Sequence, residues 1–457
     1  MAVTRKPPRH ARHQPLPDYL RERLAGLIPP GSRLCVALSG GRDSVALLHA
    51  LYPLRHLYPL SAIHVNHGLS PNASAWQTFC QTLCASLSVA FAAVAVQVDP
   101  CDARGIEAAA RAERRRVFAG QTADYIVLAH HQDDQAETVL LQLLRGAGIK
   151  GLAAMPVVLP MQQGPALLRP LLELPRSQIE AWARSRQLTW VDDESNLDSR
   201  YRRNFLRHDL LPRVGQHYPG WRSALARSAS LMAEADGLLD ELAGLDARQA
   251  IRANRLDCAL LHQLSPARAR NLLRYFVQQH GLAAPSASRL ADMLGQLLDA
   301  APHRDIRIEL PPMVLRRYQG WAWLLPEQPD LPGHLQWIWQ GEPVLWLPEL
   351  DGRLVFDRDN GQRGGLRIPG SGQLTIRLRQ GGESFRAQFN RPQKSLKALL
   401  QETGLPPWQR ARLPLLWHED QLVCVPGIGV AVDWQTRPGE SGWVVRWDTN
   451  TRSDAED

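Results

Sequence analysis

Short apolar runs alternate with amphipathic stretches over the first third of the chain. The runs have the length of strands, and the stretches have the i, i+3, i+4 apolar spacing of helices. In chain order these segments are Leu34–Leu38, Ser44–Leu54, Ala62–Val65, Ala73–Leu87, Phe91–Val98, Ile106–Gly120, Tyr125–Ala129 and Asp134–Leu144. The alternation predicts an α/β fold, a parallel sheet with helices on both faces. Ligands bind such sheets at the carboxyl ends of the strands, so we expect the site in the strand-to-helix turns.

The rest of the chain has a different pattern. One helix is expected before the sheet, at Asp18–Leu27. Beyond the sheet the expected helices are Trp221–Leu242, Ser265–Gln279, Ala287–Leu298 and Ser395–Gln401, and the expected strands are Thr375–Leu378, Leu422–Pro426 and Trp443–Trp447. We therefore expect a mainly helical middle domain and a small α+β C-terminal domain.

Changes of pattern place the domain boundaries. A flexible basic tail, residues 1–17, is expected before a catalytic α/β domain at residues 18–216. A helical and strand-containing substrate-binding domain follows at 217–352. The Gly- and Arg-rich stretch 353–372 is predicted to be a linker to a C-terminal domain at 373–448, and residues 449–457 are predicted to be a disordered tail.

The apolar pattern argues against a membrane-spanning protein, and we expect no export of the chain. Among the 457 residues no apolar run approaches the roughly 20 residues that a membrane helix needs. The N-terminal segment lacks the apolar core of a signal peptide. The 6 cysteines are widely and irregularly spaced, without a Cys-x-x-Cys pair, which indicates reduced thiols and a cytoplasmic location.

The charge favours an acidic partner without identifying it. The chain carries 53 Lys+Arg against 45 Asp+Glu, a net charge of +8. Arginine supplies almost all of the positive charge, and its planar fork suits phosphate. An arginine-rich base composition would produce the same excess, so the charge alone does not decide between a nucleic-acid partner and no partner.

The strongest motif is the loop Ser39-Gly40-Gly41-Arg42-Asp43-Ser44, between a predicted strand and a predicted helix. The free N–H groups and positive end of that helix would bind an anion, and the two serine hydroxyls add donors for phosphate oxygens. Asp43 would repel a phosphate unless a divalent cation lay between them. The loop lacks the Gly-Lys-Ser/Thr of a Walker A motif. It therefore predicts a phosphate site of another kind, with Mg²⁺ at Asp43.

This loop resembles the pyrophosphate loop of the N-type ATP pyrophosphatases, which split ATP while adenylating a carbonyl oxygen. Within that superfamily the chain is most similar to the tRNA(Ile)-lysidine synthetases in their full-length, three-domain form. The segments that carry this closer resemblance are His64–Leu69, Gly105–Arg111, His130–Thr138, Asp193–Asn196 with its continuation through Asp198, Tyr201 and Arg203 to Arg207, and a block from Lys394 to Leu416.

The resemblance implies an activity. Members of the family use ATP to adenylate C2 of the wobble cytidine in the isoleucine tRNA whose anticodon is CAU, releasing pyrophosphate. Free L-lysine then displaces AMP and leaves lysidine, which changes codon reading from AUG to AUA and tRNA identity from methionine to isoleucine. The expected cofactors are ATP and Mg²⁺, and the expected partners are this tRNA and free lysine. The sequence does not show the oligomeric state and leaves a homodimer open.

The resemblance also implies roles for individual residues. Those expected in catalysis are Asp43, Arg111, His130 and Asp134, and those expected at ATP are Ser39, Gly40, Gly41, Arg42, Asp43, Ser44 and His64. Arg111, Asp134 and Glu137 are expected to position lysine or the intermediate. The residues expected at the tRNA are Arg203, Arg207, Lys394, Lys397 and Arg410.

The residues taken alone leave several of these roles open. Asp134 and Glu137 would share one helical face, as metal ligands or as groups that steer an amine, whereas Glu137 could instead balance the helix dipole. His130 could be a core or capping histidine. Arg203 and Arg207 could hold RNA phosphates or pair with the acids of residues 192–194. For Trp408, packing in a small core is favoured over stacking on RNA.

Three other functions are weighed against a lysidine synthetase. A tRNA thiolase of the same superfamily is disfavoured because there is no Cys-x-x-Cys pair, and an amidotransferase-type synthetase is disfavoured because no glutaminase signature is present. A non-catalytic RNA-binding relative is disfavoured because Asp43, Ser44, Asp134 and Glu137 are all retained. ATP–pyrophosphate exchange that depends on the CAU-anticodon tRNA would separate these possibilities.

Overall fold

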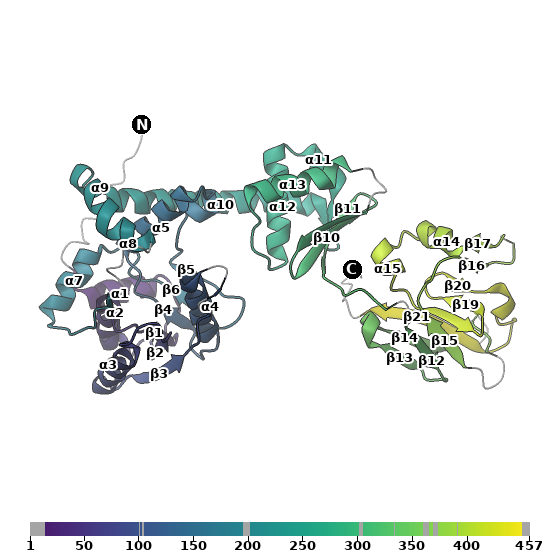
Figure 1. The fold of residues 1–457 in the computed structure, drawn as a ribbon, viewed down its shortest axis with the longest axis horizontal. Helices are drawn as coiled ribbons and strands as arrows, with labels where there is room; N and C mark the ends of the chain where they lie inside the picture. The colour runs from purple at the N-terminus through teal and green to yellow at the C-terminus, as the bar shows by residue number, and fades with distance from the viewer. Residues whose placement is uncertain are drawn as a thin grey trace. The chain divides into compact units, whose positions relative to one another are not determined.

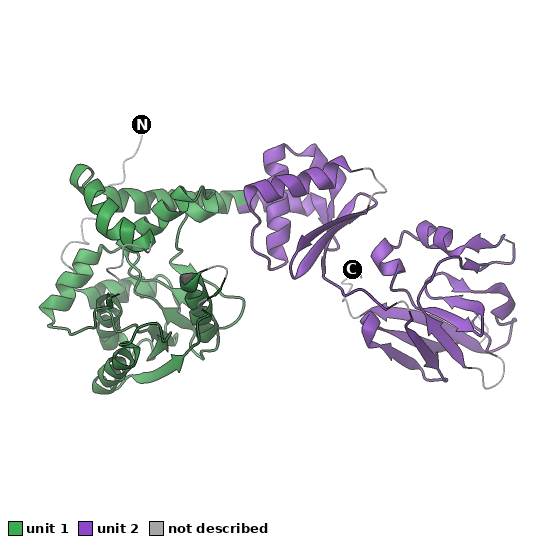
Figure 2. Cartoon of the chain, viewed as in Figure 1, with its two compact units in different colours: residues 1–239 green, residues 240–457 purple. Residues whose placement is uncertain are grey.

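The computed structural model describes residues 14–99, 101–102, 105–194, 202–300, 305–332, 334–359, 365–368, 373–390 and 392–449. The chain divides into two compact units, residues 1–239 and 240–457 (Figure 2). Most of the expected N-terminal tail, nearly all of the C-terminal tail, and Ser195, Asn196, Asp198 and Tyr201 of the family-like segments lie outside the described residues.

A six-stranded sheet organises the first unit, in the order β3-β2-β1-β4-β6-β5 (Figure 1). Its strands are β1 (Leu34–Ala37), β2 (Leu60–Asn66), β3 (Ala90–Ala95), β4 (Tyr125–Val127), β5 (Val158–Leu159) and β6 (Ala166–Leu168). All neighbouring strands are parallel except β5 and β6, which are antiparallel. The four predicted strands are confirmed within a few residues, and the short β5 and β6 are additions.

Helices cover both faces of this sheet, as predicted (Figure 1). They are α1 (Leu16–Ala25), α2 (Arg42–Leu51), α3 (Ala73–Ser86), α4 (Ile106–Ala119), α5 (Gln132–Leu144), α6 (Ile149–Leu152) and α7 (Arg176–Ser185). Alternate residues of β1 enter different cores. Leu34 and Val36 pack in one core with α1, α2, α3 and α7, whereas Cys35 packs in another with Val117 and Phe118 of α4.

Short helices lead from the sheet to a long one. They are α8 (Arg202–Phe205), a π-helical turn (Leu206–Leu210) and α9 (Leu211–His217), and the long helix is α10 (Trp221–Ala250). A small core joins them to α5, with Ala136, Leu206, Leu211 and Trp221 buried together. This packing places the arginines of α8 and the π-turn over the N-terminal half of α5.

The second unit opens with a helical layer on an antiparallel sheet. Its elements are β7 (Ile251–Arg252), β8 (Arg255–Asp257), α11 (Cys258–Gln263), α12 (Pro266–Gln279), α13 (Ala287–Asp299), β9 (Ile306–Leu310), β10 (Met313–Tyr318) and β11 (Trp321–Pro326). The helix predicted to start at Ser265 is confirmed, because its hydroxyl accepts from Arg268 N and Pro266 fills the first helical position.

The remainder of this unit is built on two antiparallel sheets and a hairpin. One sheet has the order β12 (Gln336–Trp339), β15 (Leu374–Arg377), β18 (Leu415–His418), β19 (Gln421–Val425) and β20 (Gly429–Val430), and the other has β13 (Val344–Leu347), β14 (Gly352–Asp359) and β21 (Gly442–Thr449). The hairpin is β16 (Ser384–Phe385) with β17 (Lys394–Ser395), followed by α14 (Leu396–Glu402) and α15 (Pro407–Arg410).

The predicted linker at 353–372 is wrong over its first part. Residues 352–359 form β14, the central strand of its sheet, paired with both β13 and β21. Leu354 and Phe356 alternate into the core, at 0% and 2% exposure. The stretch is rich in Gly and Arg, which indicated a linker, although its alternating Leu354 and Phe356 have the period of two that is typical of a strand.

Two further findings concern the cysteines and the helices of the described residues. All six cysteines are free thiols, and only Cys101 is exposed. No helix in the described part of the chain is both long enough and apolar enough to cross a membrane.

Candidate active site

The loop Ser39–Ser44 forms a tight turn between β1 and the start of α2. The Ser39 and Ser44 hydroxyl oxygens are 3.0 Å apart, Gly41 N donates to Ser39 Oγ at 3.3 Å, and Ser44 Oγ donates to Gly41 O at 2.9 Å. Gly41 is the N-cap of α2 and supplies no side-chain cap. The first N–H groups of α2 are therefore open to an external anion.

Gly40 occupies a position in the loop that has no room for a side chain. Its φ of +88° is unfavourable for a residue with a side chain. A Cβ there would also lie 2.8 Å from Val191 Cγ2 and 3.2 Å from Cys80 Sγ. Val191 N donates to Gly40 O at 3.0 Å, which fixes the segment after α7 against the loop.

A hydrogen-bonded chain connects the loop to α5. His131 is 2% exposed and caps this helix: its Nδ1 accepts from Asp134 N at 3.3 Å, and its own N donates to Asp134 Oδ2 at 3.0 Å. Its Nε2 lies 3.5 Å from Asp43 Oδ2. Because Nδ1 accepts, Nε2 carries the proton that faces Asp43.

Hydrogen bonds and neighbouring charges shift the pKa values of Asp43 and His131. Burial alone would raise the pKa of Asp43, but the hydrogen bond and charge of His131 together with Arg42 lower it below its usual value. Burial alone would lower the pKa of His131, but the hydrogen bond to Asp43 and the charges of Asp134 and Asp43 raise it. The pair therefore favours an ionised Asp43.

Arg203 and Arg207 enclose the carboxylates of Asp134 and Glu137. Arg203 reaches Glu137 Oε2 at 2.7 Å and Asp134 Oδ1 at 2.8 Å, and Arg207 reaches Glu137 Oε1 at 2.7 Å and Asp134 Oδ1 at 3.1 Å. The structure pairs both arginines with acids more than 60 residues earlier in the chain, an arrangement that local sequence cannot reveal. A contact of either arginine with RNA phosphates stays a prediction.

This cluster makes Asp134 a weak base. Burial would raise the pKa of Asp134, but His131, Arg203, His130 and a backbone hydrogen bond lower it to about 2. Glu137 is 1% exposed, so both of its oxygens bind guanidinium groups away from water. The expectation that the two carboxylates share a helical face is confirmed.

The structure also gives the surroundings of three more expected site residues, His130, His64 and Arg111. His130 follows β4. Burial lowers its pKa to about 3, and the positive charges of Arg169, Arg203 and Arg114 act in the same direction, whereas Asp134 opposes them. Its Nδ1 has no hydrogen-bond partner in the described residues. His64 is buried on β2 with its Nδ1 2.9 Å from Leu38 O, and burial lowers its pKa. Arg111 is exposed on α4.

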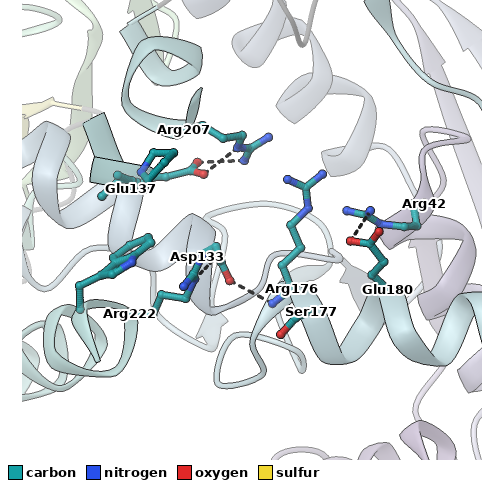
Figure 3. Close-up of a pocket in the computed structure, with 11 residues that line it drawn as sticks. Arg42, Asp133, Glu137, Arg176, Ser177, Glu180, Arg207 and Arg222 are labelled. Atoms are coloured by element: carbon teal, nitrogen blue, oxygen red, sulfur yellow. Dashed lines mark hydrogen bonds and ion pairs between the residues drawn. The ribbon is translucent and has the colours of Figure 1, made fainter. Parts of the chain in front are cut away.

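A pocket of about 450 Å³ opens beside the loop and contains residues that the sequence patterns did not single out (Figure 3). Arg222 donates to Asp133 Oδ1 at 2.5 Å, and the backbone N of Arg176 donates to Asp133 Oδ2 at 3.0 Å. Arg42 is 2.8 Å from Glu180. Arg176 and Glu180 lie on α7, after the strand β6. The rule that sites lie in strand-to-helix turns would have found them had this three-residue strand been recognised.

Comparison with known proteins places the chain in a family. The PP-loop domain model matches residues 18–214, the TilS substrate binding domain model matches 256–323, and the TilS substrate C-terminal domain model matches 374–447. A tRNA(Ile)-lysidine synthase of Nitrosomonas europaea is 45% identical over 94% of this chain and 95% of its own length. The chain belongs to the tRNA(Ile)-lysidine synthase family. Proteins of that name from Azoarcus and Coxiella burnetii are 42% and 36% identical, over 95% and 91% of this chain and 95% and 93% of their own.

Solved structures resemble parts of this lysidine synthase family member. The U34-tRNA thiolase NcsA of Methanococcus maripaludis aligns with a TM-score of 0.41 at 18% identity, covering 48% of this chain and 78% of its own. A TilS C-terminal domain aligns with a TM-score of 0.22 at 19% identity, covering 25% of this chain and 98% of its own.

In this lysidine synthase family member, three residues expected at the tRNA have different surroundings. Lys397 is exposed on α14, and Lys394 Nζ pairs with Glu402 Oε1 at 2.7 Å. Arg410 is only 8% exposed, donates to Leu405 O at 2.5 Å and also bonds the Tyr318 hydroxyl. The Arg410 guanidinium therefore contacts protein groups in this structure, and its contact with RNA stays a prediction.

Trp408 packs on aromatic side chains of β10 and β11, and not inside the small C-terminal core predicted for it. Its ring meets those of Trp323 and Tyr318 edge-on, at 5.4 and 6.3 Å between centroids, and the Arg316 guanidinium lies 5.2 Å from it. These contacts hold α15 against β10 and β11 within the second unit.

Proposed function

We propose that this chain joins the ε-amine of L-lysine to C2 of the wobble cytidine in the isoleucine tRNA with a CAU anticodon, at the expense of ATP. The observation that carries the proposal is the match, over more than nine tenths of the chain, to proteins named tRNA(Ile)-lysidine synthase. The intact loop and its neighbouring carboxylates support a catalytic member of that family. The product would read AUA in place of AUG and carry isoleucine identity.

The loop supports the first half-reaction. The C2 oxygen of cytidine attacks the α-phosphorus of ATP, the bond from that phosphorus to the bridging oxygen breaks, and pyrophosphate leaves with the electron pair. The open N–H groups of α2 and the Ser39 and Ser44 hydroxyls are suited to hold phosphate oxygens while this charge develops. His64 and Gly40 fix the strand end and turn that present them.

Mg²⁺ fits one residue of this site. The Asp43 carboxylate is 27% exposed, and no cluster of three His, Cys, Asp or Glu side chains suited to a metal occurs among the described residues. Mg²⁺ is commonly held by one or two carboxylates, phosphate oxygens and water, so Asp43 with ATP would be sufficient. When bound, the ion would neutralise charge on the phosphates.

The second half-reaction requires that lysine lose its ε-ammonium proton. Its nitrogen then bonds to C2, and the C2–O bond breaks so that AMP leaves with the oxygen. A carboxylate whose pKa is about 2 takes up a proton poorly near neutral pH. We therefore propose that Asp134 orients the reactants and leaves proton removal to another group, and that Glu137 helps to position them. Arg111 would stabilise the adenylated intermediate.

The second unit and its exposed cations would bind the body of the tRNA. Lys394 and Lys397 remain proposed contacts, and we propose that Arg203 and Arg207 act through the carboxylates they enclose. The domain boundaries outside the corrected linker, a cytoplasmic location and a homodimer stay predictions. Light scattering of the purified chain would test the last of these.

The decisive experiment follows the anticodon cytidine itself. The purified chain is incubated with ATP, isotope-labelled lysine and the CAU-anticodon isoleucine tRNA, and the nucleosides are analysed by mass spectrometry. We expect labelled lysine on the wobble cytidine, with an Asp43→Asn variant as the inactive control. Folded wild-type protein that leaves the cytidine unmodified would overturn the proposal.

A further inference from the structure

The pocket beside the loop contains buried cationic atoms that have no acceptor. Four arginines line it, and Arg207, Arg222 and Arg42 are paired with Glu137, Asp133 and Glu180. The Nε of Arg176 and the Nη2 of Arg42 are buried without a hydrogen-bond partner in the described part of the chain. Buried donors left unpaired are costly, so these two point to a ligand oxygen.

The backbone adds to this positive potential. Arg42 and Arg176 are the first residues of α2 and α7, and Asp133 is the second residue of α5. The amino ends of three helices of ten or more residues therefore meet at one pocket, each with its partial positive charge. Asp133 balances part of that charge by accepting from Arg176 N, and the lining also includes Ser177.

The pocket adjoins the phosphate loop and is continuous with it through Arg42. Figure 3 shows the Arg176 side chain rising from the start of α7 between the Glu137–Arg207 pair and the Arg42–Glu180 pair. Arg176 is also close enough to Asp43 for its charge to lower the pKa of that carboxyl. A cation in this place would meet phosphate oxygens that extend beyond the loop.

We propose that Arg176 and Arg42 form an oxyanion subsite that binds the pyrophosphate released from ATP. The proposal rests on the adenylation described above, in which pyrophosphate departs with the electron pair of the broken bond and carries added negative charge. The three acids of the pocket are already paired with arginines, so the buried Arg176 Nε and Arg42 Nη2 have no acceptor in the described residues and can donate to that charge. An arginine fork suits it because it can donate to two phosphate oxygens at once.

The test measures pyrophosphate binding directly. Inorganic pyrophosphate is titrated into the full-length chain with Mg²⁺ and without tRNA or lysine, and binding is followed by calorimetry. We expect Arg176→Gln to weaken binding by about 10- to 100-fold, the usual value of a charge-assisted hydrogen bond. Arg176→Lys, which keeps the charge but loses the fork, should recover part of the affinity. Arg186→Gln removes the same charge from the exposed far end of α7 and should bind as the wild type does.

The outcomes separate this subsite from the proposed function. Wild-type affinity in a folded Arg176→Gln variant would overturn the subsite, as would a wild-type chain that does not bind pyrophosphate. A raised KM for lysine with unchanged pyrophosphate binding would also overturn it, by assigning the pocket to the carboxylate of the amino acid. The titration contains neither tRNA nor lysine. Its result therefore does not depend on whether the chain modifies cytidine.

Discussion

At the residue scale, the central carboxylates of the site are already neutralised by the protein. Asp134 and Glu137 were predictable as a pair from their spacing of three on a helix, and so was their place at the end of a strand. Their partners were not predictable. Arg203 and Arg207 approach from a segment more than 60 residues away, and only tertiary packing of Leu206 and Leu211 against Ala136 brings them there.

The same environment gives Asp134 a measurable role in stability. Its pKa is lowered from 3.8 to about 2, so the unfolded chain takes up this proton at a higher pH than the folded chain does. The stabilisation is complete above about pH 5 and is lost as the pH falls toward 2. It amounts to about 2 kcal/mol.

Urea unfolding at pH 5, 4 and 3 checks this prediction. Asp134→Asn should lose free energy of unfolding at pH 5 and show a shallower decline toward pH 3 than the wild type. Asp209→Asn, at an exposed carboxylate in the π-turn, serves as the control and should keep the wild-type slope. Equal pH slopes in wild type and Asp134→Asn would contradict the assignment.

At the element scale, long periodic segments were predictable and short ones were not. The strand–helix alternation from β1 to α5 follows from hydrophobic period, although β3 at the edge of the sheet has no fully buried residue. By contrast, β5 and β6 have two and three residues, too few for a period to register, whereas β4, also of three residues, lies in the longer apolar run Tyr125–Ala129. Missing β6 meant missing the turn into α7, and with it Arg176 and Glu180 of the pocket.

The turn between β1 and α2 makes a prediction at this scale. Gly40→Ala combines an unfavourable positive φ with a Cβ placed against Val191 and Cys80, so it should destabilise the first unit and abolish ATP-dependent modification. The backbone strain should cost about 1–2 kcal/mol, and the overpacking about 1–3 kcal/mol more.

Gly31→Ala is a matched control for that variant. Gly31 has a similar φ of +81°, but nothing lies within 4 Å of a Cβ built there. It should therefore show the strain without the clash, and it should retain modification activity. Thermal unfolding together with the mass-spectrometric assay separates the two effects, and equal losses for both glycines would show that Val191 and Cys80 yield to the extra carbon.

At the scale of the whole molecule, the net charge says little about RNA binding until the exposed cations are distinguished from those paired inside the protein. The net charge of +8 was compatible with either an RNA partner or base composition. In the structure many arginines are paired with acids or laid on aromatic rings, such as Arg274 with Asp240 and Arg358 over Trp443. The cations free to meet a phosphate are therefore fewer than the composition implies, and Lys397 is one of the exposed ones.

Salt dependence of tRNA binding tests that assignment. The logarithm of the association constant should fall linearly with the logarithm of salt concentration, and Lys397→Gln should reduce the slope by about 0.7–0.9, the value of one phosphate contact. Arg55→Gln is the control. The Arg55 guanidinium lies over the Tyr52 ring, and the residue precedes the amino end of β2, away from the carboxyl ends of the strands. An unchanged slope in Lys397→Gln would show that Lys397 of α14 makes no phosphate contact with the tRNA.

The burial of the cysteines has a practical consequence for following this protein in solution. Burial raises the pKa of Cys80 and Cys84 to about 12 and about 11, and that of Cys424 to about 12, so these thiols stay protonated and slow to react near neutral pH. Cys101 is the exposed one, between β3 and the helix that carries Arg111. A maleimide dye should therefore attach at one position in the native, unmutated chain. Its fluorescence would report on the approach of tRNA to that side of the catalytic sheet.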